Sequence, residues 1–373
     1  LFDLEHGITS GDRSLDDSYI RVVSASEIEG LRHSQGWATD QYVFFVARFS
    51  EPCLETQLYI DGRPASGSNR EIRGTTAKAV LHYQTKKGKQ IEVKVALSAV
   101  STEGARKNLE EELPGWDFDR TVNHAQEAWN SELGKVKITG GSKEQQTIFY
   151  TALYHTLLTP NLYSDVDGQY RGMDQMVHSG DGDNYYTVFS LWDTYRAVHP
   201  LFNLIEPERN QAFIKTMLKQ YEATGLLPVW ELSGCENNCM IGYHAVSVIA
   251  DAYTKGFRGF NADKALEAML AGGTQKTEGI DAYRKYRFIP QEATTNSVSK
   301  VLEYAYDDWC IAQMAKAMGR TSEYREYIQR SQCYQNQYDA TTGFMRPRHA
   351  DGSWLTPFDP FKVSLLDQGD YTE

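Results

Sequence analysis

The pattern of apolar and polar residues divides the chain into two parts. In the first part apolar residues alternate with polar ones, as in β-strands, and in the second part they recur with the wider spacing of a helix. Residues 42–49 (YVFFVARF) are rich in β-branched and aromatic side chains, and in residues 91–97 every second position is apolar. Both patterns favour β-strands. Gly and Pro interrupt the runs between them at intervals typical of turns. Many short strands with such turns predict a β-sandwich in the first hundred or so residues.

One hairpin is predicted within this part. The apolar run 77–85 (AKAVLHYQT) precedes the alternating run 91–97, and residues 86–89 (KKGK) between them suit a turn. Two strand-like runs joined by a short Gly-containing loop are typical of a hairpin. We therefore expect these two strands to pair with each other.

From about residue 143 the apolar positions recur with the spacing of a helix. In residues 143–160 they mark one face, and Pro160 ends the pattern. Strands followed by helices predict two domains, β then α. Long helices joined by loops that carry unusual residues are typical of an (α/α)-barrel, and an irregular bundle is also compatible with this pattern. Further helices are predicted at about 207–223, 240–256, 262–272, 297–318 and 321–337.

Composition and charge narrow the classes of function. The chain has 373 residues, is 41% hydrophobic and carries a net charge of −12. An acidic chain repels phosphate backbones and anionic lipid surfaces, which argues against nucleic acid or a membrane surface as a partner. No run of 18 apolar residues occurs, so no transmembrane helix is predicted. The chain starts at Leu1 rather than Met and stops without a tail-like composition, so we interpret both ends as lying within a longer polypeptide.

Two blocks in the helical part combine aromatic and charged residues. Residues 183–203 read DNYYTVFSLWDTYRAVHPLFN, and residues 225–248 read GLLPVWELSGCENNCMIGYHAVSV. Burying charged groups costs free energy unless they are paired or used. Aromatic faces can stack on the apolar side of a pyranose ring, while carboxylates and Arg hydrogen-bond its hydroxyls. The two blocks therefore predict a carbohydrate-active protein.

In the first block, Trp192 is a candidate wall of a sugar subsite and Asp193 a candidate acceptor for sugar hydroxyls. The alternative is a buried Trp beside an Asp that pairs with Arg196, three residues further on.

In the second block, Gly234 permits close approach of the backbone, and Glu236 can accept hydrogen bonds from hydroxyls, with Cys235 between them. His244 is more typical of a histidine whose hydrogen bonds are satisfied in the core.

No metal site is predicted from these residues. Cys235 and Cys239 lie one helical turn apart, but no second Cys/His pair accompanies them as a zinc site requires. Residues 165–168 (DVDG) resemble the start of a calcium loop, but the Glu of an EF-hand is missing. Asp307 and Asp308 are adjacent in a predicted helix, so their side chains point in different directions and form no carboxylate pair.

Eight ordered blocks give the chain a specific resemblance. The blocks are GLRHSQGWATDQ (30–41), YRGMDQ (170–175), YYTVFSLWDTYRAVHPL (185–201), GLLPVWELSGCENNCMIGYH (225–244), SVSKVLEYAYDDWCIAQMAKAMG (297–319), GFMRPRHADGSW (343–354), FDP (358–360) and DYTE (370–373). With these blocks the chain resembles glycoside hydrolase family 92, the calcium-dependent exo-acting α-mannosidases.

The resemblance implies an N-terminal β-sandwich followed by a catalytic (α/α)6 barrel, both incomplete in this chain. With the patterns above, it divides the chain into three parts. Residues 1–103 are expected to be the C-terminal part of the sandwich, and residues 104–142 a helical linker. Residues 143–373 are then the first part of the barrel.

The resemblance also implies an activity: hydrolysis of terminal α-linked mannose from glycans, with inversion and with the help of calcium. Inversion needs two carboxyl groups, one that protonates the leaving oxygen and one that activates water. Glu373, in DYTE, matches the general acid of the family. The substrate-binding residues expected here are Trp192, Asp193, Gly234, Cys235 and Glu236.

The general base and the calcium ligands of the family are expected downstream of this chain, and a periplasmic or extracellular location is implied. Two alternatives stay open. One is another (α/α)-barrel glycosidase or a glycoside phosphorylase, which a comparison of phosphate with water as acceptor would distinguish. The other is a non-catalytic carbohydrate-binding relative.

Overall fold

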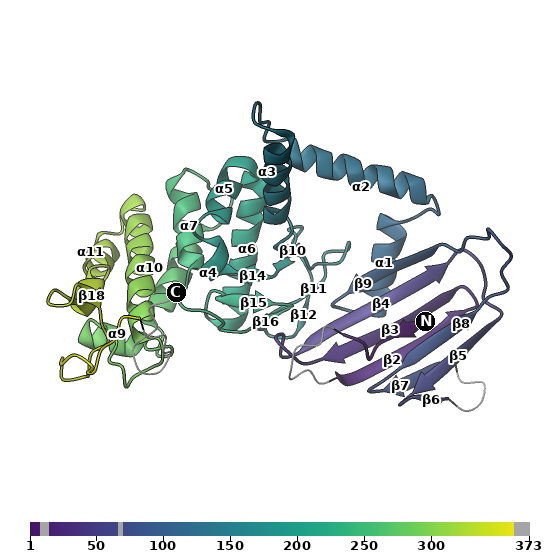
Figure 1. Cartoon of the computed structure of the whole chain (residues 1–373), viewed down its shortest axis with the longest axis horizontal. Coiled ribbons are helices and arrows are strands. Elements are labelled where there is room, and N and C mark those ends of the chain that lie inside the picture. The colour runs from purple at the N-terminus through teal and green to yellow at the C-terminus, as the bar shows by residue number, and fades with distance from the viewer. Residues whose placement is uncertain (8–14, 66–69, 362–373) are drawn as a thin grey trace. The chain divides into compact units, whose positions relative to one another are not determined.

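The structure is a computed structural model that describes residues 1–7, 15–65 and 70–361. Glu373, the candidate general acid, lies outside the described residues. The chain folds into two compact units. Unit 1 comprises Leu1–Val188 and Glu231–Asn237, and unit 2 comprises Phe189–Trp230 and Asn238–Glu373. Figure 1 shows the strands of unit 1 and the helices of unit 2.

Two antiparallel sheets form the N-terminal part of unit 1 (Figure 1). Their strand orders are β7-β2-β3-β4-β9 and β1-β8-β5-β6. Ile20, Ile28 and Phe45 of the first sheet share one core with Leu58 and Ala79 of the second, which confirms the expected β-rich N-terminal part. The strands are β1 (Phe2–Asp3), β2 (Leu15–Ser24), β3 (Glu27–Ser34), β4 (Gln41–Phe49), β5 (Glu55–Ile60), β6 (Arg63–Pro64), β7 (Glu71–Gly74), β8 (Lys78–His82) and β9 (Val93–Ser98).

The predicted hairpin between residues 77–85 and 91–97 is wrong. β8 pairs with β5 and β1, whereas β9 pairs with β4 in the other sheet. An alternating pattern identifies a strand but leaves its partner open, because the partner depends on which faces become buried. In β9 the buried apolar side chain is Ala96, which packs with Leu109 of α1 (Thr102–Glu112), while the larger apolar side chains of this edge strand are exposed.

The remaining elements of unit 1 connect the sheets to the second aromatic block. Asp165 is buried and accepts hydrogen bonds from Ser98 Oγ at 2.7 Å and Asn108 Nδ2 at 2.8 Å. The first Asp of the calcium-like sequence 165–168 therefore fastens its loop to β9 and α1. The other elements are α2 (Phe118–Leu133), α3 (Lys143–Thr156), β10 (Asn161–Leu162), β11 (Tyr170–Arg171), β12 (Val177–His178), β13 (Tyr186–Thr187) and β16 (Cys235–Glu236), with most of β15 (Trp230–Leu232).

Unit 2 is helical, which confirms the expected helical part. Two predicted boundaries differ from the structure. The backbone has positive φ at Met240 (66°) and Gly242 (86°), so the helix expected from residue 240 begins at Ala245. The last predicted helix ends at Arg330 and continues as the 3₁₀ helix Cys333–Gln337. The helices are α4 (Leu191–Thr194), α5 (Val198–Ile205), α6 (Pro207–Thr224), α7 (Ala245–Thr254), α8 (Ala262–Thr274), α9 (Ile280–Tyr286), α10 (Ser297–Ala317) and α11 (Thr321–Arg330), with short strands β14 (Phe189–Ser190), β17 (Tyr338–Asp339) and β18 (Phe344–Met345).

Helix α10 is the centre of unit 2 and packs against α7, α8 and α11. Ile311 of α10, Ile249 of α7 and Met269 of α8 are fully buried. Within the described ranges, no helix has both the length and the apolar character needed to cross a bilayer.

Candidate functional site

In unit 2, the two candidate sugar-binding residues of the first block lie on the short helix α4. Trp192 is partly buried, and Asp193 is exposed. Ser190 Oγ donates a hydrogen bond to the Asp193 carboxylate and is its single hydrogen-bond donor among the described residues. An exposed carboxylate with one neutral donor retains lone pairs for the hydroxyls of a ligand.

The alternative interpretation supposed that Arg196 pairs with Asp193, and this is wrong: Arg196 pairs with Glu303 instead. Its Nη2 donates to Glu303 Oε1 at 2.9 Å. The guanidinium lies 5.2 Å from the centre of the Trp192 ring and 4.8 Å from that of Tyr195. A guanidinium over an aromatic face is held by cation–π attraction. Arg196 thus links Trp192 to a carboxylate that comes from a different helix.

Glu303, on α10, was missed by the sequence analysis and connects three side chains. Its Oε2 accepts from Tyr195 Oη at 3.1 Å and lies 3.5 Å from His244 Nε2, while its Oε1 accepts from Arg196. The Glu303 side chain is 14% exposed. Because these contacts join residues that lie between 59 and 108 positions apart, no local sequence pattern could have identified the set.

His244 is buried as the sequence favoured, but its hydrogen bonds are only half satisfied, because its Nε2 has no hydrogen-bond partner among the described residues. It is 1% exposed, and its Nδ1 lies 2.8 Å from Asp307 Oδ1. Its ring stacks on that of Tyr195 with centroids 4.0 Å apart. Asp307 also accepts from the backbone N–H of Tyr243 at 2.8 Å. Burial raises the pKa of the Asp307 carboxyl, whereas His244 and this N–H lower it.

Asp308 faces different partners from those of Asp307, as adjacent positions on a helix predict. Its Oδ1 accepts from Tyr243 Oη at 2.8 Å, and its Oδ2 accepts from Arg330 Nε at 3.0 Å. Both carboxylates are fully buried, which the sequence did not reveal. They bind different partners, so they form no carboxylate pair.

In unit 1, the second block contains a tight hairpin. Glu231 lies opposite Glu236 and Leu232 opposite Cys235, so residues 233 and 234 form a two-residue turn. Both turn residues have positive φ, 52° at Ser233 and 79° at Gly234, as a type I′ turn requires. A Cβ on Gly234 would lie 3.1 Å from the Gly172 carbonyl oxygen. The close backbone approach expected at Gly234 is therefore an approach to residues 171–172.

Cys235 is buried and held by hydrogen bonds. Its Sγ accepts from Gln175 Nε2 at 3.3 Å and lies 3.6 Å from the carbonyl oxygen of Asp40. Gln175 Nε2 also donates to the Gly234 carbonyl at 2.8 Å. Glu236 is partly buried and, by the register of the hairpin, shares a face with Glu231.

Glu231 is a second carboxylate that the sequence analysis missed. It is 0% exposed, and its oxygens accept from Thr187 Oγ1 at 2.8 Å, Gly234 N at 2.7 Å and Val188 N at 3.1 Å. Burial, with the like charge of Glu236, raises its pKa to about 7 against these three donors. A Glu within the apolar run 227–232 was the available signal.

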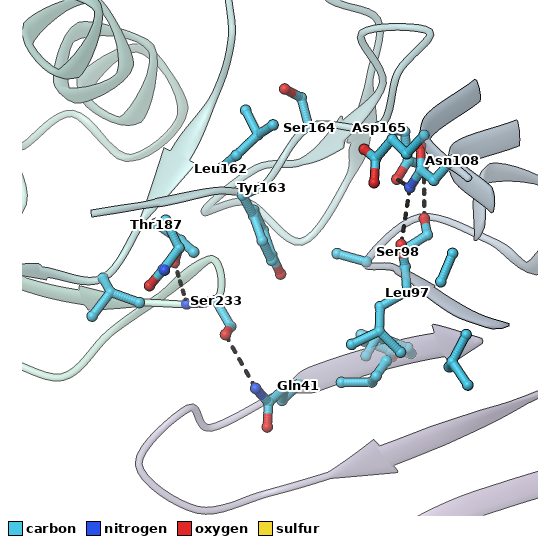
Figure 2. A pocket seen from close by; sticks show the side chains of 18 residues that line it. Gln41, Leu97, Ser98, Asn108, Leu162, Tyr163, Ser164, Asp165, Thr187 and Ser233 are labelled. Atoms are coloured by element: carbon cyan, nitrogen blue, oxygen red, sulfur yellow. Dashed lines mark hydrogen bonds between the residues drawn. The ribbon is translucent and has the colours of Figure 1, made fainter. Parts of the chain in front are cut away.

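A cavity of about 500 Å³ lies in unit 1 beside this hairpin (Figure 2). On one side Gln41 Nε2 donates to Ser233 Oγ at 3.1 Å, and the Ser233 N–H donates to Thr187 Oγ1 at 2.7 Å. The Tyr163 ring points into the cavity, and its hydroxyl is buried with no hydrogen-bond partner in the described part of the chain. Burial also raises the pKa of Tyr163. The cavity wall is therefore fixed by the same groups that hold the turn.

The described residues do not form a metal centre. Within residues 1–7, 15–65 and 70–361, no group of three or more His, Cys, Asp or Glu side chains is placed to hold a metal ion. The five cysteines are all free thiols.

Comparison with known proteins identifies the family. The model of the glycosyl hydrolase family 92 N-terminal domain matches residues 1–98, and that of the family 92 catalytic domain matches residues 104–373.

Similar solved structures and one similar protein support the same family. A family GH92 α-mannosidase from Bacteroides thetaiotaomicron is 40% identical, with a TM-score of 0.91 over 95% of this chain and 49% of that one. A GH92 inverting mannosidase from the same organism is 31% identical, with a TM-score of 0.88 over 95% of this chain and 49% of that one. An uncharacterized secreted glycosidase of Arthroderma benhamiae is 27% identical over 95% of this chain and 46% of its own length.

The chain thus spans about half the length of these relatives. Its match to the catalytic-domain model alone covers well over half of its residues. The β-rich part, the helical part and the aromatic blocks all lie within the two matched regions. The chain belongs to glycosyl hydrolase family 92.

Proposed function

We propose that the protein is an exo-acting, inverting α-mannosidase that releases terminal α-linked mannose from glycans. The observation that carries this proposal is the 40% identity to a family GH92 α-mannosidase over 95% of the chain. The same relative also has a structure in complex with mannoimidazole. The inverting outcome is supported by the likeness to a mannosidase described as inverting.

In unit 2, Trp192 forms one wall of a mannose subsite, and Asp193 accepts hydrogen bonds from the sugar hydroxyls. The exposure of the Asp193 carboxylate supports this role. Arg196 is held over the Trp192 ring and against Glu303, so it orients the indole rather than neutralising Asp193.

In unit 1, Gly234, Cys235 and Glu236 form a second set of sugar contacts. Gly234 permits the tight turn that presents this segment, and Glu236 supplies acceptor oxygens. The fixed turn and the hydrogen bonds to Cys235 support a rigid contact surface, which lowers the entropy lost on binding.

Glu373 acts as the general acid that protonates the leaving oxygen, and the general base and calcium ligands lie beyond this chain. Calcium, when bound, supplies a hard cation that binds hydroxyl and carboxylate oxygens. We expect chelation of the full-length protein to abolish its activity and calcium to restore it better than magnesium, since magnesium demands tighter octahedral geometry. Full activity after exhaustive chelation would contradict the calcium requirement.

The helices of the catalytic part form an (α/α)6 barrel in the whole protein. The partly exposed apolar side chains of Leu302, Tyr306 and Trp309 support this, because they form one stripe along α10 against which barrel helices can pack. An extracellular or periplasmic location is supported by the likeness to a secreted glycosidase.

The test of the activity is proton NMR of the first sugar released from an α-mannobiose by the full-length protein. Inversion gives β-mannose first, and initial α-mannose would overturn the inverting mechanism. A mannosyl phosphate formed on addition of inorganic phosphate would instead indicate the phosphorylase alternative. Binding of mannoimidazole without any turnover of α-mannosides would indicate a non-catalytic relative.

A further inference from the structure

At two positions around the second block, the backbone of a residue other than glycine has a conformation that favours glycine. Val188 has φ of 70° and Ser233 has φ of 52°. Positive φ is uncommon for any residue with a Cβ and is an outlier for a β-branched one. Such conformations persist only where the surroundings fix them, and they cluster at functional sites. Contacts within unit 1 must therefore fix the backbone conformation of residues 188 and 233.

The buried carboxylate of Glu231 contacts both places. Its Oε2 accepts the Val188 N–H at 3.1 Å, and its Oε1 accepts the Gly234 N–H at 2.7 Å. Thr187 extends the contact to Ser233, because its hydroxyl donates to Glu231 at 2.8 Å and accepts the Ser233 N–H at 2.7 Å. The Glu231 carboxylate and the Thr187 hydroxyl thus accept hydrogen bonds from three backbone N–H groups, those of Val188, Ser233 and Gly234.

The acceptor at position 231 has to be a carboxylate. All three groups that point at it are donors, and an amide side chain would turn an NH₂ toward at least one of them. Burying a carboxylate is unfavourable unless donors compensate for its lost hydration. Its direct opposition to Glu236 in the hairpin adds repulsion. An apolar residue of the same size would avoid both costs but would leave Val188 N–H, Gly234 N–H and the Thr187 hydroxyl without their acceptor, so the carboxylate is the group that holds this turn.

We propose that Glu231, together with Thr187, is a positioning residue that fixes the Ser233–Gly234 turn and thereby the placement of Gly234, Cys235 and Glu236. This inference rests on the proposed function, which assigns those three residues to sugar binding. Glu231 itself is fully buried with its oxygens occupied by protein donors, so it contacts no substrate.

Thr187 offers a matched pair of variants. Thr187→Val keeps the shape of the side chain and removes the hydroxyl, which leaves the Ser233 N–H without its acceptor. Thr187→Ser keeps the hydroxyl and removes a methyl group. Glu231→Gln removes the charge at nearly constant volume. If Glu231→Gln fails to fold, the Thr187 pair still decides the question.

The experiment uses the full-length protein and two readouts. Hydrogen exchange followed by mass spectrometry reports the amides of residues 231–237, and steady-state kinetics on an aryl α-mannoside reports KM and kcat. We expect Thr187→Val and Glu231→Gln to exchange these amides at least about tenfold faster and to raise KM about tenfold, because displaced sugar contacts weaken binding. Thr187→Ser should stay within about twofold of the wild type in both.

Loss of active protein without a change in KM would show a merely structural role and overturn the inference, as would unchanged exchange in Thr187→Val. If the wild type hydrolyses no α-mannoside, the proposed function fails, and the exchange readout alone decides whether Glu231 and Thr187 fix the turn.

Discussion

At the scale of single residues, the carboxylates of this chain differ in what surrounds them. Glu231, Asp307 and Asp308 are fully buried and accept hydrogen bonds from protein donors. Asp193 is exposed, and Ser190 is its one donor among the described residues. Buried polar groups are normally satisfied within the protein, so they serve the structure or position other groups. Of these four carboxylates, Asp193, which is exposed and lies beside Trp192, is the one suited to a ligand.

Asp193→Ala should therefore impair activity and leave stability almost unchanged. If Asp193 holds sugar hydroxyls through the transition state, kcat/KM of the full-length enzyme should fall at least ~100-fold, which corresponds to about 2.7 kcal/mol. Asp281→Ala is a suitable control, because Asp281 is an exposed Asp in the first turn of α9. A large fall in Tm with near-normal kcat/KM for Asp193→Ala would show that Asp193 is structural.

His199 allows a prediction about pH. It is 1% exposed, and its Nδ1 donates to Asn210 Oδ1 at 2.8 Å. Burial lowers its pKa from 6.5 to about 4, so the folded protein keeps the imidazole neutral. The unfolded chain binds a proton below pH 6.5, and stability is lost as pH falls from 6.5 to 4. The loss amounts to about 3 kcal/mol.

The measurement compares Tm between pH 6.5 and 4 for the wild type and His199→Asn, which keeps a donor near the position of Nδ1. The wild type should lose several degrees more than the variant across this range. Parallel Tm curves would mean that the pKa of His199 is the same in the folded and the unfolded chain.

Some of the candidate residues could be proposed from the sequence, and others could not, for a physical reason. Trp192, Asp193 and Gly234 stood out because each breaks the pattern of its own neighbourhood. Glu303 did not, because its role comes from Arg196, 107 positions away in the chain. Glu231 was likewise defined by Thr187, 44 positions earlier. Contacts between distant segments become visible only in the folded chain.

At the scale of elements, the helices were predicted more reliably than the pairing of strands. A helix satisfies its hydrogen bonds locally, so the apolar spacing and the end signals of α6, α8 and α10 were sufficient. β8 and β9 were each visible as strands, but their partners lie elsewhere in the chain. The division into residues 1–103, 104–142 and 143–373 stays a prediction.

The contact between α10 and α11 depends on a buried ion pair. Arg330 is 2% exposed, and its Nε donates to Asp308 Oδ2 at 3.0 Å. Its Nη2 lies 3.0 Å from Asp308 Oδ1, within ion-pair distance but without the geometry of a hydrogen bond. Asp308 has no access to water, so removing Arg330 leaves a buried charge without its partner.

We expect Arg330→Leu to destabilise the protein by about 3–5 kcal/mol, seen as a large fall in Tm. Arg325→Leu, at an exposed position on the same helix, should change Tm little. The double variant Asp308→Asn/Arg330→Leu should be more stable than Arg330→Leu alone, because no ionised group remains buried. A single variant as stable as the wild type would show that the pair contributes nothing to stability.

At the scale of the whole molecule, inversion requires two carboxyl groups on opposite sides of the sugar. Glu373 is the candidate acid, and it lies outside the described residues, so its role rests on the family motif DYTE. The chain spans about half the length of its relatives, and the proposed base belongs to the remainder. The chemistry can therefore be tested only in the full-length protein.

The prediction for Glu373 follows from what a general acid does. Proton donation helps most where the leaving group is poor, so Glu373→Gln should nearly abolish cleavage of an α-mannobiose. It should retain far more activity on an activated aryl mannoside, whose phenolate leaves with little help from a proton. The basic limb of the pH–rate profile should also disappear, because that limb reports the acid losing its proton. Equal losses on both substrates with an unchanged profile would assign Glu373 to binding or structure, and Glu236 would become the next candidate for the acid.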